Sequence, residues 1–186
     1  MTNPPLFPDA YYHVYTHAVG QEYFFREARN YRYFLQRYTH YILPIAETFA
    51  YCLLPTHMHF LIRVREHVAP QQASRAWSNL FNAYTKAFNL LYQRRGSLFQ
   101  RPFGRRRIES QSQLIYTVIY IHRNPQKHGV IADFRRWSWS SYPALQGQVP
   151  THLVKQEVWG WFGGREAFIN AHKMPLVGET KDSIDL

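Results

Sequence analysis

Apolar and polar residues follow one another in the first part of the chain in a way that predicts a strand and then a helix. Residues 11–19 are rich in aromatic and β-branched types and end at Gly20, which is typical of a β-strand. Residues 27–41 place apolar side chains at helical spacing among Arg and Gln, which predicts an amphipathic helix. Pro44 marks the end of this helical region.

The next apolar segments predict two strands joined by a tight turn. Residues 45–54 form an apolar stretch that is interrupted by Pro55-Thr56, and the apolar pattern returns over residues 59–64. Residues 70–93 then begin at a proline and carry apolar side chains on one broad face, which predicts the longest helix.

A basic loop follows, and it leads into a short strand that ends near Ile108. Residues 110–121 predict a further helix with Ser110 as its N-cap. The resulting order favours an α+β fold, with a split βαββαβ sheet that carries helices on one face and an added C-terminal helix. Beyond Asn124-Pro125 we expect an irregular tail as far as Leu186.

The composition indicates one basic domain. Its 186 residues suit a single domain, and 22 Lys and Arg against 12 Asp and Glu give a formal net charge of +10. That charge favours a polyanionic partner. Because no apolar stretch has the roughly 18 residues of a spanning helix and the N-terminus lacks the pattern of a signal peptide, we expect a cytoplasmic protein without a membrane contact.

His57 and His59 are the first candidates for chemistry. They are two residues apart at the start of a predicted strand, where alternate side chains point to the same face. Two neutral imidazoles on one face can hold a divalent metal ion, and zinc hydrolases also use such pairs. An isolated pair of this kind is more often structural, so the pair alone leaves both roles open.

A second candidate group lies at the end of the last predicted helix. Tyr120 and Asn124 are four residues apart and so share one helix face. A tyrosine oxygen can attack a phosphate whose leaving charge is stabilised, and an amide oxygen one turn away can serve as a third metal ligand. The alternative is a packing stripe that ends in a helix cap before Pro125.

The basic loop is the candidate DNA contact. Its arginines lie beside two phenylalanines, which suits phosphate contacts combined with stacking on unpaired bases. A solvated loop is the alternative, and the net charge of +10 favours DNA contact. The residues concerned are Arg94, Arg95, Phe99, Arg101, Phe103, Arg105, Arg106 and Arg107.

Several of these motifs occur together in a known family. The segments 55–62 (Pro-Thr-His-Met-His-Phe-Leu-Ile) and 120–125 (Tyr-Ile-His-Arg-Asn-Pro) resemble the REP-associated tyrosine transposases and the wider single-tyrosine HUH transposases, named for the pattern His, hydrophobic residue, His. Further matches are Tyr12-His13-Val14, residues 96–100 (Gly-Ser-Leu-Phe-Gln) and residues 139–142 (Trp-Ser-Ser-Tyr). Together they span residues 11–143, most of the chain.

This resemblance implies a ferredoxin-like antiparallel sheet that carries the histidines. It implies that His57, His59 and Asn124 bind Mg²⁺ or Mn²⁺, and that Tyr120 forms a 5′-phosphotyrosine link with single-stranded DNA. The suggested substrate is DNA near hairpins, in particular repetitive extragenic palindromes, and the family acts as a monomer or a homodimer. The expected products are cut and rejoined strands.

The resemblance predicts a transposase domain over residues 11–143, with an N-terminal tail at 1–10 and a C-terminal extension at 144–186. Two positions depart from the family pattern. Thr56 stands where relatives often have Asn, and Tyr116 lies one turn before Tyr120 and is therefore a competing nucleophile. Three histidines are given no role: His13, His17 and His122.

Two other functions are compatible with the same residues. A domesticated relative would bind hairpins without cutting them, and the intact His57, His59 and Tyr120 argue against it. A metal-dependent hydrolase would use water as its nucleophile, and Tyr120 would then be structural.

Overall fold

Strands and helices are interspersed as far as residue 127, and the described chain beyond it is helical or irregular. The computed structural model describes residues 4–20, 22–148 and 150–174. Its elements in chain order are β1 (Tyr11–His17), α1 (Ala28–Tyr41), β2 (Ala46–Leu53), β3 (His57–Val64), α2 (Pro70–Leu91), β4 (Gly104–Ile108), α3 (Gln111–Lys127), the 3₁₀ turn η1 (Phe134–Arg136), α4 (Tyr142–Gln146), α5 (Lys155–Phe162) and α6 (Arg165–Ala171).

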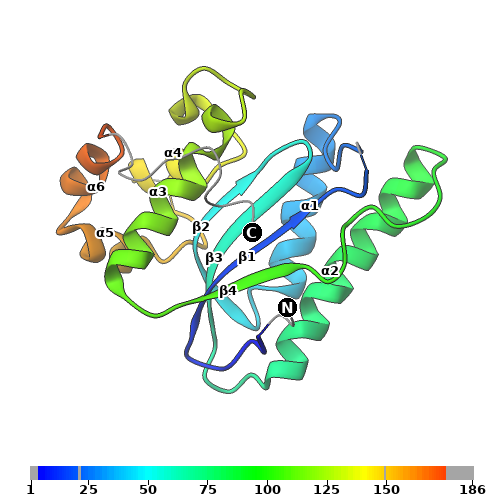
Figure 1. Ribbon diagram of the computed structural model, residues 1–186, viewed down its shortest axis with the longest axis horizontal. Coiled ribbons are helices and arrows are strands. Elements are labelled where there is room, and N and C mark those ends of the chain that lie inside the picture. The colour runs from blue at the N-terminus through cyan, green and yellow to red at the C-terminus, as the bar shows by residue number, and fades with distance from the viewer. Residues whose placement is uncertain (1–3, 21, 149, 175–186) are drawn as a thin grey trace.

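The four strands form one antiparallel sheet in the order β2-β3-β1-β4. The two central strands, β3 and β1, are not neighbours in sequence, which is the pairing expected of a split βαββαβ sheet. The predicted α+β fold of ferredoxin-like type is therefore confirmed (Figure 1). In the pairing of β1 with β3, Tyr15 lies opposite His59 and His17 lies opposite His57.

One face of the sheet is covered by α1 and α2, as predicted (Figure 1). Phe60 of β3 is the centre of this core, because Tyr38 of α1 and Trp77 of α2 pack on it with ring centroids 4.5 and 5.5 Å away. Phe60 and Trp77 are fully buried, and burial of an aromatic side chain of this size stabilises the fold by roughly 2–3 kcal/mol.

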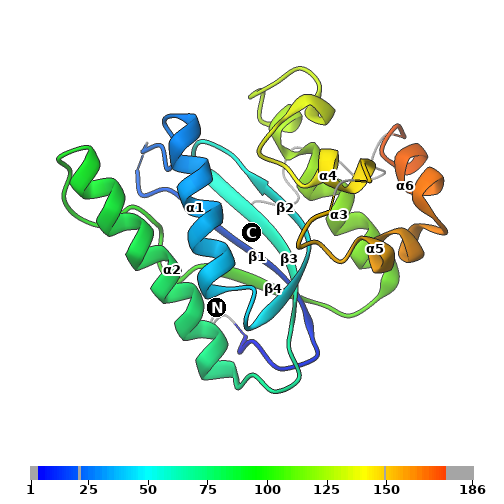
Figure 2. The same cartoon turned by 180° about the vertical axis from the view of Figure 1, so that it is seen from behind.

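The opposite face of the sheet is covered by α3 and by the C-terminal helices (Figures 1 and 2). A second core forms there, and it contains Leu61 of β3, Val118 of α3, Val158 of α5 and Phe168 of α6. The prediction of an irregular tail was wrong for α4, α5 and α6. These helices are too short to show a clear periodicity in the sequence, and packing on α3 stabilises them.

Ion pairs also connect the C-terminal helices to the sheet. Arg63 of β3 binds Glu47 of β2 at 2.6 Å and Glu157 of α5 at 3.1 Å. The predicted boundary after residue 143 falls inside α4. Residues 1–3 of the predicted N-terminal tail and residues 175–186 of the predicted extension lie outside the described residues.

The helix α3 is longer than the sequence predicts. Ser110 is its N-cap, as expected. Its pattern indicates an end near residue 121, before Asn124-Pro125, whereas the helix continues through Pro125. That expectation was wrong because Asn124 and Pro125 are both buried, and their packing outweighs the single backbone hydrogen bond that proline removes. Asn124 therefore stands in the helix one turn after Tyr120.

A buried hydrogen-bonded chain connects α3 to α6. His122 Nε2 lies 2.8 Å from the Ser141 hydroxyl, and His122 Nδ1 lies 2.8 Å from His172 Nε2. His172 Nδ1 donates in turn to the Phe168 carbonyl at 2.8 Å. Because His172 donates through Nδ1, its Nε2 must accept from His122 Nδ1, so the chain requires an uncharged His172.

Acid should therefore weaken the fold through this pair. Burial lowers the pKa of His172 from 6.5 to about 4 and that of His122 well below its ordinary value. Because the folded-state pKa values lie below those of the unfolded chain, the stabilisation is complete above about pH 6.5 and is lost as the pH falls towards 4. Between pH 7 and 5, the free energy of unfolding should fall by about 2 kcal/mol more in the wild type than in His172→Gln.

The measurement is urea unfolding of both proteins at each pH. The comparison removes the contribution of the carboxylates, which both proteins share. Equal pH slopes would contradict a neutral, buried His172.

Candidate active site

Strand β3 places His57 and His59 on the face of the sheet that α3 covers. The two residues are separated by one position in the strand, so both rings project to the same side, as predicted. Their ring centroids are 5.3 Å apart, and the residues are only 5% and 3% exposed.

The helix α3 brings Asn124 to this pair. Asn124 is fully buried, and its Oδ1 lies 2.8 Å from His57 Nε2, which donates to it. The Thr56 hydroxyl lies 3.1 Å from His57 Nδ1. A hydroxyl can donate or accept, so threonine at position 56 gives the imidazole a partner in either tautomer.

Tyr120 lies against the other histidine. Its ring centroid is 5.5 Å from that of His59. On the helix surface, the Lys127 ammonium lies 5.3 Å from the Tyr120 ring centroid, and Tyr116 stacks parallel to Tyr120 at 6.4 Å. Tyr116 is one turn nearer the helix N-terminus, and Asn124 is one turn nearer the C-terminus. Tyr120 is therefore the tyrosine that lies beside His59 and one helix turn from Asn124.

The donor atoms fit a divalent metal ion. His59 Nε2 is buried and has no hydrogen-bond partner among the described residues. Burial, followed by the neighbouring histidines, lowers the pKa of His59 well below its ordinary value and so keeps its lone pair available. Within the described ranges, no group of three His, Cys, Asp or Glu side chains is arranged to bind a metal. A three-residue site here therefore depends on the amide oxygen of Asn124.

His13 is a residue of this site that the sequence did not reveal. It is 7% exposed, and its Nε2 lies 2.9 Å from His59 Nδ1. If His59 directs the lone pair of Nε2 at a metal, its Nδ1 carries the proton and donates to His13. The alternation along β1 places His13 on the same face as Tyr15 and His17, but only the register of β1 on β3 shows that it meets His59.

We expect His13 to matter for metal affinity through this hydrogen bond. His13→Phe removes the acceptor but keeps a ring, and it should weaken Mn²⁺ binding in calorimetric titration by at least about tenfold. His13→Gln offers an amide oxygen in place of Nε2 and should recover most of that loss. An unchanged affinity in His13→Phe would show that the contact only packs the strands.

Comparisons with known proteins show what the chain as a whole resembles. No protein-family model matches the chain. A protein of Haemophilus influenzae that is named REP-associated tyrosine transposase is 28% identical over 103 residues, which cover 52% of this chain and 58% of that protein. A solved structure of a REP-associated tyrosine transposase bound to a REP hairpin matches with a TM-score of 0.66, at 18% identity, over 77% of this chain and 83% of that chain. The chain resembles the REP-associated tyrosine transposases.

The two comparisons carry different weight. The match to the Haemophilus influenzae transposase spans less than two thirds of that protein's length, so it supports the resemblance in sequence over part of the molecule. The match to the hairpin-bound transposase has low identity and shows the fold.

Only part of the basic segment, residues 94–107, faces solvent. The Arg94 side chain is 15% exposed and binds Glu22 at 3.0 Å. Phe99 and Phe103 are 2% and 9% exposed in the core beneath α2, and the half-buried Arg105 lies over the Phe103 ring. The loop folds both rings into the core, so neither ring faces solvent in this structure.

Arg106 is the arginine of this segment that lies on the side of the site. It is exposed on β4 and pairs in register with His13. Burial, and after it the charge of Arg106, lowers the pKa of His13 to about 3. Three further arginines of the segment are exposed: Arg95, Arg101 and Arg107.

Tyr15 is a second residue that the sequence did not single out. It is half-buried on β1, with its ring 6.2 Å from His59. The neighbouring strand has Gly104 beneath it, where a Cβ atom would lie 2.3 Å from the Tyr15 ring. The absent side chain at position 104 therefore lets an aromatic ring lie flat beside the candidate metal ligands.

Proposed function

We propose that the chain is a metal-dependent endonuclease and strand transferase, a tyrosine transposase that cuts and rejoins single-stranded DNA near hairpins. The observation that carries this proposal is the convergence of α3 on β3. Asn124 Oδ1 lies 2.8 Å from His57 Nε2, and the Tyr120 ring lies 5.5 Å from that of His59. A nucleophile and three potential ligands thus share one site.

Tyr120 would perform the covalent step. Its hydroxyl loses a proton and its oxygen forms a bond to phosphorus, while the bond from phosphorus to the 3′ oxygen breaks. The 3′ oxygen takes up a proton and leaves as a hydroxyl, and the DNA remains attached as a 5′-phosphotyrosine. Attack by a 3′ hydroxyl reverses these steps and reseals or exchanges the strand without ATP.

His57, His59 and Asn124 would hold Mg²⁺ or Mn²⁺. When bound, the ion supplies Lewis-acid stabilisation to a non-bridging oxygen of the scissile phosphate. Lys127 places a positive charge 5.3 Å from the Tyr120 ring centroid, where it would attract the phosphate. Tyr120 is 3% exposed, so the phosphate gains access to its hydroxyl only when neighbouring groups move.

The DNA substrate follows from charge and from the resemblance. Arg106 and the other exposed arginines of the basic segment would contact phosphates, and Tyr15 replaces the two buried phenylalanines as the ring available for base stacking. A hairpin with an unpaired flank, as in repetitive extragenic palindromes, presents a phosphate that duplex geometry does not block.

No described helix is long and apolar enough to cross a membrane. We place the reaction in the cytoplasm, by a monomer or a homodimer.

The test is incubation of the protein with end-labelled hairpin DNA that carries single-stranded flanks, in Mg²⁺ or Mn²⁺, followed by denaturing electrophoresis. The palindromic repeats nearest to the coding sequence provide the hairpin. A protein–DNA adduct that EDTA prevents is expected. Binding without an adduct would favour a domesticated binding module, and cleavage without an adduct would favour a hydrolase that uses water.

A further inference from the structure

A pocket of about 370 Å³ lies between α2 and the loop that leads into β4. Its walls combine two arginines, Arg101 and Arg105, with two serines of α2 and with three phenylalanines. The serines are Ser74 and Ser78, and the phenylalanines are Phe81, Phe99 and Phe103. The candidate metal ligands and Tyr120 do not line this pocket, so it is separate from the candidate active site.

Neighbouring groups hold both arginines in place. The Arg105 guanidinium donates to the Ser74 hydroxyl at 3.3 Å and lies 5.0 Å from the centre of the Phe103 ring. Arg101 donates to the side-chain oxygen of Asn82 on α2. A hydroxyl, an aromatic ring and an amide orient a guanidinium group without neutralising it. These contacts therefore fix the directions of two cations around one pocket.

Arg105 is the cation from which an anion would gain most. It is half-buried on β4, and burial lowers the pKa of its guanidinium below the ordinary value. A cation that has lost part of its water attracts an anion more strongly than one on the open surface, because the effective dielectric constant around it is lower. An anion in the pocket would restore part of the solvation that burial removes.

The floor of the pocket suits a phosphate and not a base. Phe81, Phe99 and Phe103 are buried, and Phe81 packs on the other two with ring centroids 4.7 and 5.6 Å away. The core thus takes up the ring surfaces on which a base would stack. The polar groups of the walls, which are two guanidinium groups and two hydroxyls, are of the kinds that bind phosphate oxygens.

Strand β4 connects this pocket to the candidate active site. It is an edge strand of the sheet and lies next to α2 (Figure 1). Side chains alternate along a strand, so Arg105 points to the side of α2, whereas Arg106 points to the side of His13 and the histidine pair. DNA that passes over this edge can contact both arginines at once.

We propose that this pocket binds one phosphate of the hairpin stem while the unpaired flank lies at Tyr120. In a duplex the bases pair with each other and the phosphates face outward, which matches a pocket that offers phosphate ligands and no stacking surface. Such a contact positions the DNA without reading its sequence. The choice of DNA as the ligand rests on the proposed function.

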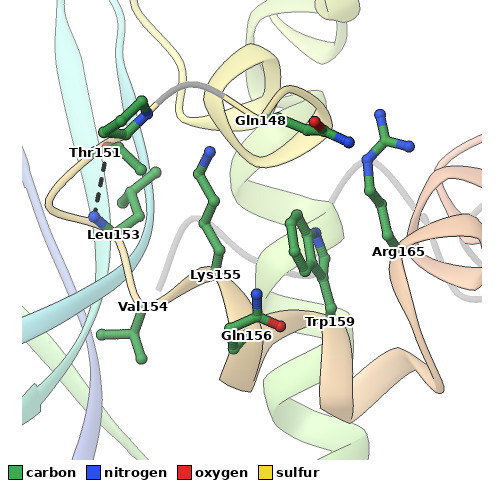
Figure 3. Close-up of a pocket in the computed structure, with 9 residues that line it drawn as sticks. Gln148, Thr151, Leu153, Val154, Lys155, Gln156, Trp159 and Arg165 are labelled. Atoms are coloured by element: carbon green, nitrogen blue, oxygen red, sulfur yellow. Dashed lines mark hydrogen bonds between the residues drawn. The ribbon is translucent and has the colours of Figure 1, made fainter.

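A larger pocket in the C-terminal part of the chain has cations with a different role (Figure 3). There, Lys155 donates to the Gly147 carbonyl and Arg165 to the Gln146 carbonyl. These hydrogen bonds stabilise the turn that follows α4, so replacement of either residue would disturb that turn. Control variants for the pocket at α2 are therefore taken from other positions.

The experiment measures binding of the hairpin without its flanks, labelled with fluorescein, to the full chain in EDTA by fluorescence anisotropy. Arg101→Gln with Arg105→Gln should raise Kd at least about tenfold and reduce the slope of log K against log salt by about 0.9, the value for one duplex phosphate. A stem of unrelated sequence should give the same change. The matched control, Arg32→Gln with Arg136→Gln, removes two exposed arginines from α1 and η1 and should change Kd less than about threefold.

A second measurement separates loss of the contact from loss of the fold. Among hairpins that each carry one neutral methylphosphonate in the stem, one position should weaken binding to the wild type at least about tenfold and have no further effect on the double variant. The absence of such a position would overturn the proposal, and stabilisation of the wild type by inorganic phosphate would then assign the pocket to a free anion. Equal Kd values for the double variant and its control, or a larger loss for a (dT)₁₂ strand than for the hairpin, would also overturn it.

These results do not depend on the nucleophile. Tyr120→Phe should bind the hairpin without flanks with the Kd of the wild type. If the hairpin binds as predicted and the wild type forms no adduct in the cleavage assay, the proposed function fails and the phosphate pocket stands.

Discussion

Replacement of Tyr120 by phenylalanine should abolish covalent attachment of the protein to hairpin DNA. The change removes one oxygen, the proposed nucleophile, and it keeps the ring that packs against His59. Loss of a covalent nucleophile typically lowers the rate by several orders of magnitude, so adduct formation should fall at least about a thousandfold. The measurement is a single-turnover time course with end-labelled DNA in Mn²⁺.

Tyr116→Phe is the matched control for this change. Tyr116 is on the same helix, and its ring stacks on Tyr120. The Tyr116→Phe variant should form the adduct at a rate within about threefold of the wild type, because the Tyr116 side chain contributes packing and no reacting atom. If Tyr116→Phe lost more of the adduct-forming rate than Tyr120→Phe, the nucleophile would be Tyr116 and not Tyr120.

Replacement of His59 by alanine should remove metal binding almost completely. Among the described residues, Nε2 of His59 has no hydrogen-bond partner, so this ligand atom is available to a metal ion. Loss of one of three protein ligands should weaken Mn²⁺ binding at least about a hundredfold, which is more than loss of a supporting residue such as His13 costs. Asn124→Ala should have an effect of the same kind.

Calorimetric titration with Mn²⁺ in the absence of DNA provides the measurement, so the result does not depend on cleavage. The control is His40→Ala, which removes an exposed histidine of α1, on the other face of the sheet. It should bind Mn²⁺ as the wild type does. Equal affinities in His59→Ala and His40→Ala would show that the histidine pair is structural and would favour a binding module.

Much of the fold follows from local patterns in the sequence. The predicted strand at residues 11–19 corresponds to β1. The two predicted amphipathic helices, at residues 27–41 and 70–93, correspond to α1 and α2. Their periodicity is long enough to identify each element, and the order of elements limits the topology to very few choices. The end of α3 and the helices after it were missed because their stability comes from contacts with the sheet and with α3.

The candidate site also contains residues that local sequence patterns predict and residues that they do not. The spacing of His57 and His59 and that of Tyr120 and Asn124 follow from strand and helix geometry within one element. His13 and Tyr15 join the site only through the pairing of β1 with β3 and β4, and no local pattern shows this register. Phe99 and Phe103 are the opposite case, because the sequence suggests that they belong to the site and the fold buries them. Aromatic residues beside arginines have the same sequence pattern whether their rings face DNA or the core.

The most direct measurement is the identification of the residue that carries the DNA. After reaction with the hairpin and digestion by trypsin and a nuclease, the modified peptide should be 108–123, which contains both Tyr116 and Tyr120. Fragmentation of this peptide in a mass spectrometer separates the two positions. The proposed site predicts a 5′-nucleotide phosphate on Tyr120. A phosphate on Tyr116, or cleavage that leaves no modified tyrosine, would contradict it.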